Sequence, residues 1–133
     1  DPVAIEELLQ MLVAATADGT TLFFSSPQIA EVQRIADRVC IIARGTLVED
    51  LSLDELRESY RRITMGFTTP PPDEELRMLG ICRVRRGDRQ LCVIASSNVD
   101  AIAERGRSMS AVSVDIAPIG LRELFLESVK AEP

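Results

Sequence analysis

The sequence contains no histidine and no tryptophan, and Lys130 is its single lysine. Aromatic residues make up only 4% of the 133 residues, so aliphatic side chains must supply any hydrophobic core. No apolar run approaches the roughly 18 residues that a membrane-spanning helix requires. A signal-peptide pattern and an initiating Met are also absent, and we therefore expect the sequence to begin inside a longer protein.

The charge balance is acidic, with a formal net charge of −6. Proteins that bind nucleic acid neutralise phosphates with clustered Lys and Arg, and their binding domains are usually basic. We therefore expect no nucleic-acid partner.

The three cysteines, Cys40, Cys82 and Cys92, have no metal-ligand spacing and no histidine to join them. Each lies in a strand-like run. An odd number of such residues indicates reduced, buried thiols of the kind found in the cytoplasm.

Residues 20–47 form the most informative stretch. The apolar run at residues 21–24 has no polar alternation, which is typical of a strand buried on both faces in a parallel sheet. Residues 39–43 repeat this pattern. Between them, helical spacing is shown by Ile29, Val32, Ile35 and Ala36. The stretch therefore predicts a β-α-β unit with a right-handed crossover.

Polar residues follow the first predicted strand, at the sheet edge where open α/β sheets bind ligands. Either Ser25 or Ser26 could cap the following helix, and Ser25 with Gln28 has capping-box spacing. Pro27 suits a first helical turn. Further on, Arg44-Gly45 predicts a turn into a third strand at residues 46–48.

The flanking segments are regular in pattern. Residues 3–17 predict a helix closed by Asp18-Gly19, with Gly19 as a left-handed cap. Residues 52–60 predict a short helix in which Ser52 and Glu55 form a capping box.

From residue 61 the predicted order is β-α-β-β-α-β-α, and its first six elements match the ferredoxin-like split β-α-β arrangement. The elements are expected at residues 63–67, 73–79, 81–86, 89–95, 98–105, 111–116 and 121–129. A tight turn at Gly87-Asp88 would place Val84 opposite Leu91. The predicted fold is α/β: a partial parallel sheet with flanking helices at residues 1–60, then a small α+β ferredoxin-like domain at residues 61–133.

Residues 20–56, TTLFFSSPQIAEVQRIADRVCIIARGTLVEDLSLDEL, resemble the closing part of an ABC-transporter ATPase subunit. Asp1-Pro2 resembles the D-loop of that family. Family members carry a histidine after the two serines, and its imidazole contacts the γ-phosphate side of ATP. Here Pro27 occupies that switch-histidine position, flanked by Ser25, Ser26 and Gln28, so the resemblance implies a degenerate site.

The resemblance implies that the full-length protein binds Mg-ATP, pairs with a second copy and drives a transmembrane permease from the cytoplasmic face of the membrane. Residues 120–127, GLRELFLE, resemble the closing helix of a C-terminal extension on exporter-type subunits. Residues 61–133 would then be a regulatory or dimerisation domain. The alternative is a non-enzymatic interaction or dimerisation module.

Phosphate binding in this family requires a Gly-rich loop that ends in Lys-Ser or Lys-Thr. Lys130 is followed by Ala131, so this chain lacks that loop and also the carboxylates that hold Mg²⁺. We therefore expect neither ATPase activity nor a bound cofactor from this chain alone. We also expect a homodimer, because strands that are apolar on both faces lack neighbours within the sequence.

One further cluster has two interpretations. Arginine is concentrated around the predicted turn at Gly87-Asp88, at positions 83, 85, 86 and 89. These side chains either form a solvated hairpin face or contact an anionic ligand.

Overall fold

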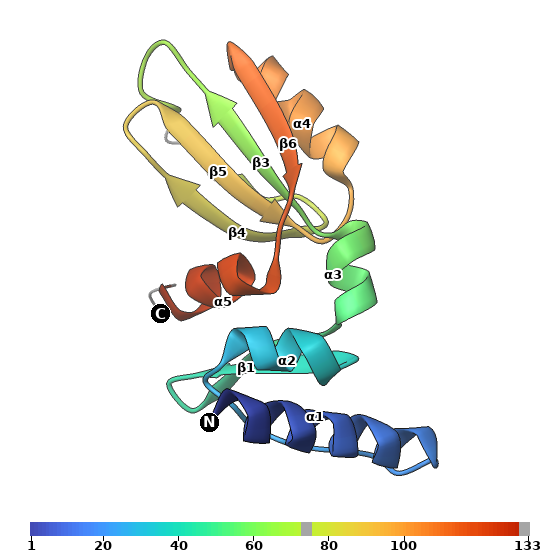
Figure 1. Cartoon of the computed structure of the whole chain (residues 1–133). Helices are drawn as coiled ribbons and strands as arrows, with labels where there is room; N and C mark the ends of the chain where they lie inside the picture. Colours follow the sequence, from blue (N-terminus) through green and yellow to red (C-terminus); the bar gives the residue numbers. More distant parts are fainter. Residues whose placement is uncertain (73–75, 131–133) are drawn as a thin grey trace. The chain divides into compact units, whose positions relative to one another are not determined.

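The computed structural model describes residues 1–72 and 76–130, which form a mixed α/β protein with five helices and two antiparallel sheets (Figure 1). The chain divides into two compact units, Asp1–Asp37 and Arg38–Pro133. None of the helices in the described ranges is long and apolar enough to cross a membrane.

The first unit contains helices α1 (Pro2–Ala17) and α2 (Ile29–Ile35). Asp1 caps α1 through its carboxylate, and Pro2 occupies the first turn. Gly19 follows the helix end with φ +89°, which confirms the predicted left-handed cap. Leu9 is the one buried residue of α1.

The predicted strand at residues 21–24 is wrong: these residues have no regular structure, and Phe23 is 93% exposed. A strand depends on backbone hydrogen bonds to a neighbour, and this segment has none in the structure. The parallel β-α-β unit is consequently absent from the described residues.

In the second unit, β1 (Arg38–Ala43) and β2 (Thr46–Ser52) form an antiparallel hairpin. The predicted turn is confirmed, since Arg44 and Gly45 have φ of 50° and 75°, as a two-residue hairpin turn requires. Burial alternates along β1. Only one face of this strand is therefore covered, which corrects the prediction of a strand buried on both faces.

Helix α3 (Leu53–Ser59) follows the hairpin directly. The Ser52 hydroxyl accepts a hydrogen bond from the Glu55 backbone N–H at 2.9 Å, as the capping spacing predicted. Tyr60 ends the helix and is buried.

The larger sheet contains β3 (Arg61–Gly66), β4 (Ile81–Arg86), β5 (Gln90–Ala95) and β6 (Ser113–Pro118). Its strand order is β4-β5-β3-β6, and all neighbours are antiparallel. Strands β4 and β6 are therefore the two edges. Helix α4 (Val99–Ser108) connects β5 to β6.

One face of this sheet carries the hydrophobic core. Ile63, Leu91 and Val93 are fully buried and cluster with Ile102 of α4. Gly106 lets α4 approach the sheet, because a Cβ there would lie 2.7 Å from the sulfur of Met65. Figure 1 shows α4 beside β3 and β6.

The opposite face is more polar. Alternation places Arg62, Cys92 and Ile94 on it. Helix α5 (Leu121–Lys130) reaches this face through ion pairs from Glu123 to Arg62 and from Glu127 to Arg85. The last helix therefore joins elements that are far apart in sequence.

Two predictions in this unit need correction. Val84 lies opposite Val93 rather than Leu91, because the loop is Asp88-Arg89 and Gly87 bonds to Gln90. An irregularity at Cys82 shifts the register further along β4. For the predicted helix at residues 73–79, residues 73–75 lie outside the described residues, and residues 76–78 are not helical.

Candidate functional site

The segment Ser25–Gln28 is an exposed turn that leads into α2. The Ser26 hydroxyl accepts a hydrogen bond from the Gln28 backbone N–H at 2.9 Å. Gln28 itself is the N-cap residue of α2, and it makes no side-chain capping bond. The prediction that a serine caps this helix is therefore wrong. The Ser26 hydroxyl instead closes a local turn with Gln28, the residue that precedes the first residue of α2.

Asp1 is placed by the start of α1. One carboxylate oxygen accepts a hydrogen bond from the Val3 backbone N–H at 3.1 Å, and the Asp1 carbonyl accepts another from Ile5 at 3.1 Å. The residue is therefore fixed as a helix cap. Among the described residues, no hydrogen bond or ion pair links Asp1 to Ser25–Gln28.

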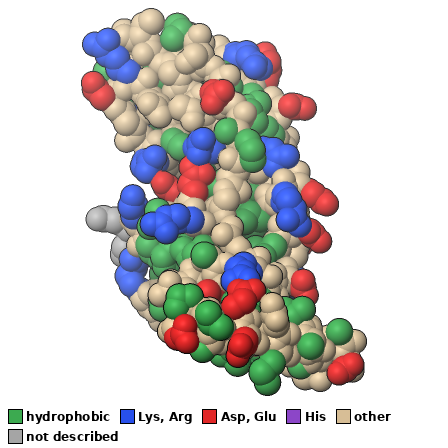
Figure 2. Space-filling model, viewed as in Figure 1, with side chains coloured by type: hydrophobic (Ala, Val, Ile, Leu, Met, Phe, Trp, Pro, Cys, Tyr) green, Lys and Arg blue, Asp and Glu red, His purple; other side chains and the backbone are tan. Residues whose placement is uncertain are grey.

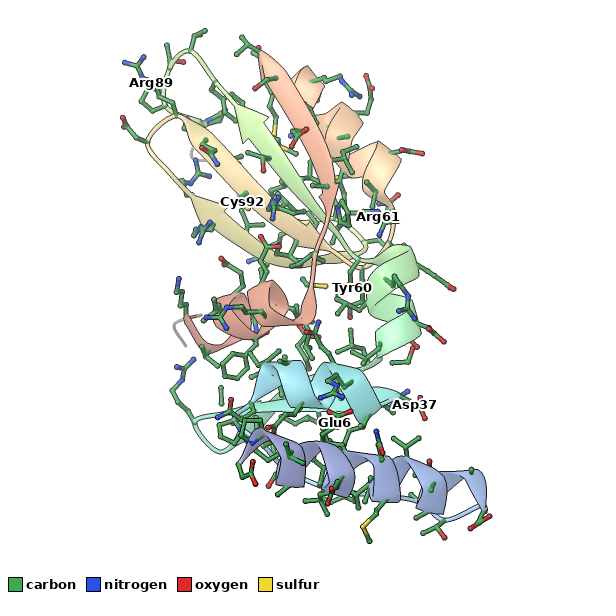
Figure 3. The ribbon with its side chains drawn as sticks, viewed as in Figure 1. Glu6, Asp37, Tyr60, Arg61, Arg89 and Cys92 are labelled. Atoms are coloured by element: carbon green, nitrogen blue, oxygen red, sulfur yellow. The ribbon has the colours of Figure 1, made fainter. Side chains whose placement is uncertain are left out.

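An ion pair joins the two helices of the first unit. Arg34 Nη2 lies 2.5 Å from Glu6 Oε2, and Figure 3 shows Glu6 projecting from α1. The hydrogen bond from Arg34 lowers the pKa of the Glu6 carboxylate. This contact was not predicted from the sequence, although both residues lie on the polar faces of their helices.

Beside this ion pair is a shallow groove of about 300 Å³, lined mainly by apolar side chains of α1 and α2. Its lining residues are Glu6, Leu9, Gln10, Val13, Ala14, Arg34 and Ile35. The two charged residues of the groove, Glu6 and Arg34, are paired with each other, so neither charge is readily available to a ligand.

The arginines around the β4–β5 turn do not converge on one point. Arg85 pairs with Glu127 at 2.7 Å, whereas Arg86 donates to the carbonyls of Pro71 and Pro72 at 3.2 and 2.7 Å. Arg89 lies in the β4–β5 loop, directly before β5 begins at Gln90 (Figure 3). The structure therefore favours individual structural roles for these arginines over a single anion site.

Arg83 differs from its neighbours. Its Nε atom is buried and has no hydrogen-bond partner among the described residues. It adjoins a hollow of about 390 Å³ whose other lining residues are Leu76, Ile81, Cys82, Val84 and Arg86. The Arg83 charge also acts on Glu49, partly offsetting the effect of burial, which raises the pKa of that carboxyl group.

Tyr60 is close to this region. Burial and the negative charge of Glu49 raise the pKa of the Tyr60 phenol to about 12. Burial also raises the pKa of the Cys82 thiol. At neutral pH both groups are therefore protonated, and neither is activated as a nucleophile or base.

The three thiols differ in exposure: Cys92 is buried, Cys82 is half-buried and Cys40 is exposed. The prediction of a buried thiol is thus wrong for Cys40, because it lies on the open face of β1. Its thiol donates to Asp50 at 3.6 Å. All three are free.

At two of the positions that resemble family motifs, the side chains are held in local contacts. The Asp1 carboxylate is engaged as a helix cap, and the Ser26 hydroxyl is engaged by Gln28. Across the described ranges, no group of three or more His, Cys, Asp or Glu residues is placed to hold a metal ion.

Comparison with curated proteins gives a consistent set of relatives. The chain is 35% identical over 65 residues to the bacitracin transport ATP-binding protein BcrA of Enterococcus faecalis, covering 48% of the chain and 21% of that protein. It is 30% identical over 70 residues to the ABC transporter ATP-binding protein YtrB of Bacillus subtilis, covering 52% and 24% respectively.

A third relative is matched over a longer segment. The chain is 32% identical over 92 residues to the ribose import ATP-binding protein RbsA 3 of Rubrobacter xylanophilus, covering 64% of the chain and 19% of that protein. The chain thus spans about a fifth of the length of the relatives it matches. No family model matches it, and no solved structure matches it significantly.

The chain belongs to the ABC-transporter ATP-binding proteins and corresponds to a C-terminal part of such a protein.

Proposed function

We propose that the complete protein is the ATP-binding subunit of an ABC transporter. It binds Mg-ATP and couples its hydrolysis to transport by a membrane permease, at the cytoplasmic face of the membrane. The observation that carries this proposal is the 35% identity to an ATP-binding transport protein over about half of the chain.

Within this proposal, residues 1–60 complete the ATPase domain and residues 61–133 form a regulatory or dimerisation extension. The ferredoxin-like assignment of the extension is supported by the order β4-β5-β3-β6, in which the first strand, β3, is central and pairs with both β5 and β6. Only Tyr60 separates the end of α3 from the start of β3, which supports a short connection between residues 1–60 and residues 61–133.

The surface of the first unit supports the presence of further protein around it. Figure 2 shows hydrophobic side chains on the surface along α1. Val3, Leu8 and Met11 are 64%, 54% and 69% exposed, and Phe23 is more exposed still. Exposed apolar groups of this number are typical of a surface that another protein segment covers. We propose that the rest of the ATPase domain covers it and pairs with residues 21–24.

The names of the relatives describe different transported substrates. One relative is named for bacitracin transport and another for ribose import. We propose the exporter type from the resemblance of residues 120–127, of which residues 121–127 lie in α5.

Pro27 makes the proposal testable at a single residue. Proline has neither a proton donor nor a proton acceptor in its side chain, whereas an imidazole has both. In the complete protein we expect Pro27→His to raise kcat by about 10²-fold, because it restores a contact at the transferring phosphoryl group. The Kd for Mg-ATP should change much less. An unchanged kcat would show that this position does not limit turnover.

Isothermal titration calorimetry with Mg-ATP distinguishes the proposal from the alternative. We expect no binding by the 133-residue chain, and binding by the complete protein that carries a Lys-bearing phosphate loop. A natural protein with no such loop would instead favour the non-enzymatic interaction module.

A further inference from the structure

The two edges of the larger sheet differ in how they are protected against pairing with another strand. Edge strand β4 carries Arg83, Arg85 and Arg86 and has an irregularity at Cys82. Charged side chains and bulges both discourage a second strand from adding to an edge. β4 is therefore a protected edge.

The opposite edge, β6, is less protected: it has no bulge, and its only protecting residues are Asp115 and, at its last position, Pro118. It carries no Lys or Arg, and its pairing with β3 continues without a register shift from Ser113 to Pro118. Two large aliphatic side chains on this segment are exposed, Val112 by 66% and Ile116 by 41%. Its one charged residue is Asp115. The backbone groups on the outer side of β6 have no strand partner among the described residues.

The sequence of β6 is self-complementary in one register. A two-fold axis perpendicular to the sheet at Val114 would place Val112 opposite Ile116 of the other copy. The same register places Ser113 opposite Asp115, so that a hydroxyl donor faces a carboxylate. Both contacts occur twice because the pairing is symmetric.

The neighbouring symmetric registers are worse. An axis at Asp115 would place two carboxylates directly opposite one another, and like charges in that position destabilise a strand pair. An axis at Ser113 would remove the Val112–Ile116 pair, which is the most exposed apolar area of the edge. The side-chain pattern therefore selects one register.

We propose that two copies of this chain associate through antiparallel pairing of their β6 strands, centred on Val114, to form one continuous eight-stranded sheet. The inference rests on the edge geometry and does not depend on the proposed transport function. A pairing limited to one strand buries less than the roughly 1,000 Å² typical of stable interfaces. The dimer of the isolated chain is therefore weak, with a Kd of about 10–100 μM.

The chain offers a matched pair of test positions. Ile116 on β6 and Val84 on β4 are both β-branched, and each is 41% exposed. We expect Ile116→Lys to weaken dimerisation by about tenfold or more, because it removes two apolar cross-strand pairs and adds charge to the edge. Val84→Lys should leave it unchanged. Sedimentation equilibrium from about 5 to 500 μM covers the required range, and circular dichroism checks folding.

A cross-linking experiment tests the register and does not depend on the lysine variants folding. In a Cys40→Ser background, which removes the exposed thiol, Val114→Cys places the two introduced thiols opposite each other at the axis. We expect oxidation to give a disulfide-linked dimer with Val114→Cys. Asp115→Cys and Val84→Cys, as controls, should give much less.

Three results would overturn the proposal. One is a monomer mass for the unchanged chain throughout the concentration range. A second is a dimer that survives Ile116→Lys but is lost with Val84→Lys or with Leu126→Glu, which alters an exposed residue of α5. The third is preferential cross-linking through position 115, which would exclude the Val114 register.

Discussion

The unit Asp1–Asp37 buries one large hydrophobic side chain, Leu9, whereas the unit Arg38–Pro133 contains a closed core around Ile63 and Leu91. Both have strongly apolar sequences. The difference is that antiparallel strands of the second unit find their neighbours within the chain, and α4 covers the face that they create. An apolar sequence pattern thus indicates which side chains need to be buried, but it does not indicate which part of the protein packs against them.

The largest test of this contrast compares two leucines. Leu91 is fully buried in β5, and Leu8 on α1 is 54% exposed. Leu91→Ala should lower the free energy of unfolding by about 2–5 kcal/mol, because it leaves a cavity. Leu8→Ala should change it by less than about 0.5 kcal/mol. Urea unfolding followed by circular dichroism measures both. Equal effects would show that α1 is as well packed as the sheet.

Two glycines sharpen the comparison. Gly19 and Gly80 have φ of +89° and +92°, so alanine is strained at both. A Cβ at Gly80 would also lie 2.3 Å from the Ser97 carbonyl oxygen, whereas nothing lies within 4 Å of one at Gly19. We expect Gly80→Ala to cost about 2–4 kcal/mol and Gly19→Ala about 1 kcal/mol. Thermal unfolding of the two variants supplies the measurement. Similar shifts in Tm would contradict the close contact at Gly80.

A third test uses the single tyrosine of the chain, which lies in the second unit. The pKa of Tyr60 is raised from 10.0 to about 12, so its neutral form is favoured in the folded state. The resulting stability is fully present below pH 10 and is lost as the pH rises through 12. Near pH 11 the loss should be ~1.4 kcal/mol.

Tyr60→Phe should remove this alkaline loss of stability, which urea unfolding at neutral and high pH can measure. Because Tyr60 is the only tyrosine, the near-ultraviolet absorbance of the folded chain reports its ionisation directly. A titration midpoint at the ordinary value of 10.0 would contradict the buried environment.

The smallest effects concern ion pairs. The side chains of Arg62 and Glu123 are each 33% exposed, whereas those of Arg34 and Glu6 are 52% and 43% exposed. Glu123→Gln should lower the free energy of unfolding by about 1 kcal/mol. The effect of Glu6→Gln should be smaller and should disappear in high salt, because exposed pairs are screened. Denaturation at two ionic strengths separates the two cases.

Local sequence signals were sufficient for several elements. Residues 3–17 predicted α1, Arg44-Gly45 predicted the hairpin turn, and Ser52 with Glu55 predicted the start of α3. In each of these cases the determining interaction lies within a few residues along the chain. The strands at the centre of the larger sheet were also predicted, because their β-branched and apolar runs are bounded by turn residues.

Interactions with distant residues could not be predicted in this way. Residues 21–24 and 39–43 have similar patterns, yet only the second segment has a strand neighbour in the structure. The register of β4 against β5 differs from the prediction because the loop lies one residue later than predicted and the pairing is irregular at Cys82. For the candidate site, the sequence predicted that Ser25 or Ser26 caps the helix. It could not show that Ser26 bonds to Gln28 rather than capping a helix.

The contacts of α5 have a consequence for the order of folding. Its residues bond to Arg44, Arg62 and Arg85, which precede their partners by 85, 61 and 42 residues. Contacts across such separations form late and slowly, because a long loop must close first. During synthesis, the Cys92 face of the sheet therefore remains exposed to solvent until α5 has left the ribosome and can pack against it. A ribosome that stops before residue 121 would release a chain with that face open to proteases and to other chains.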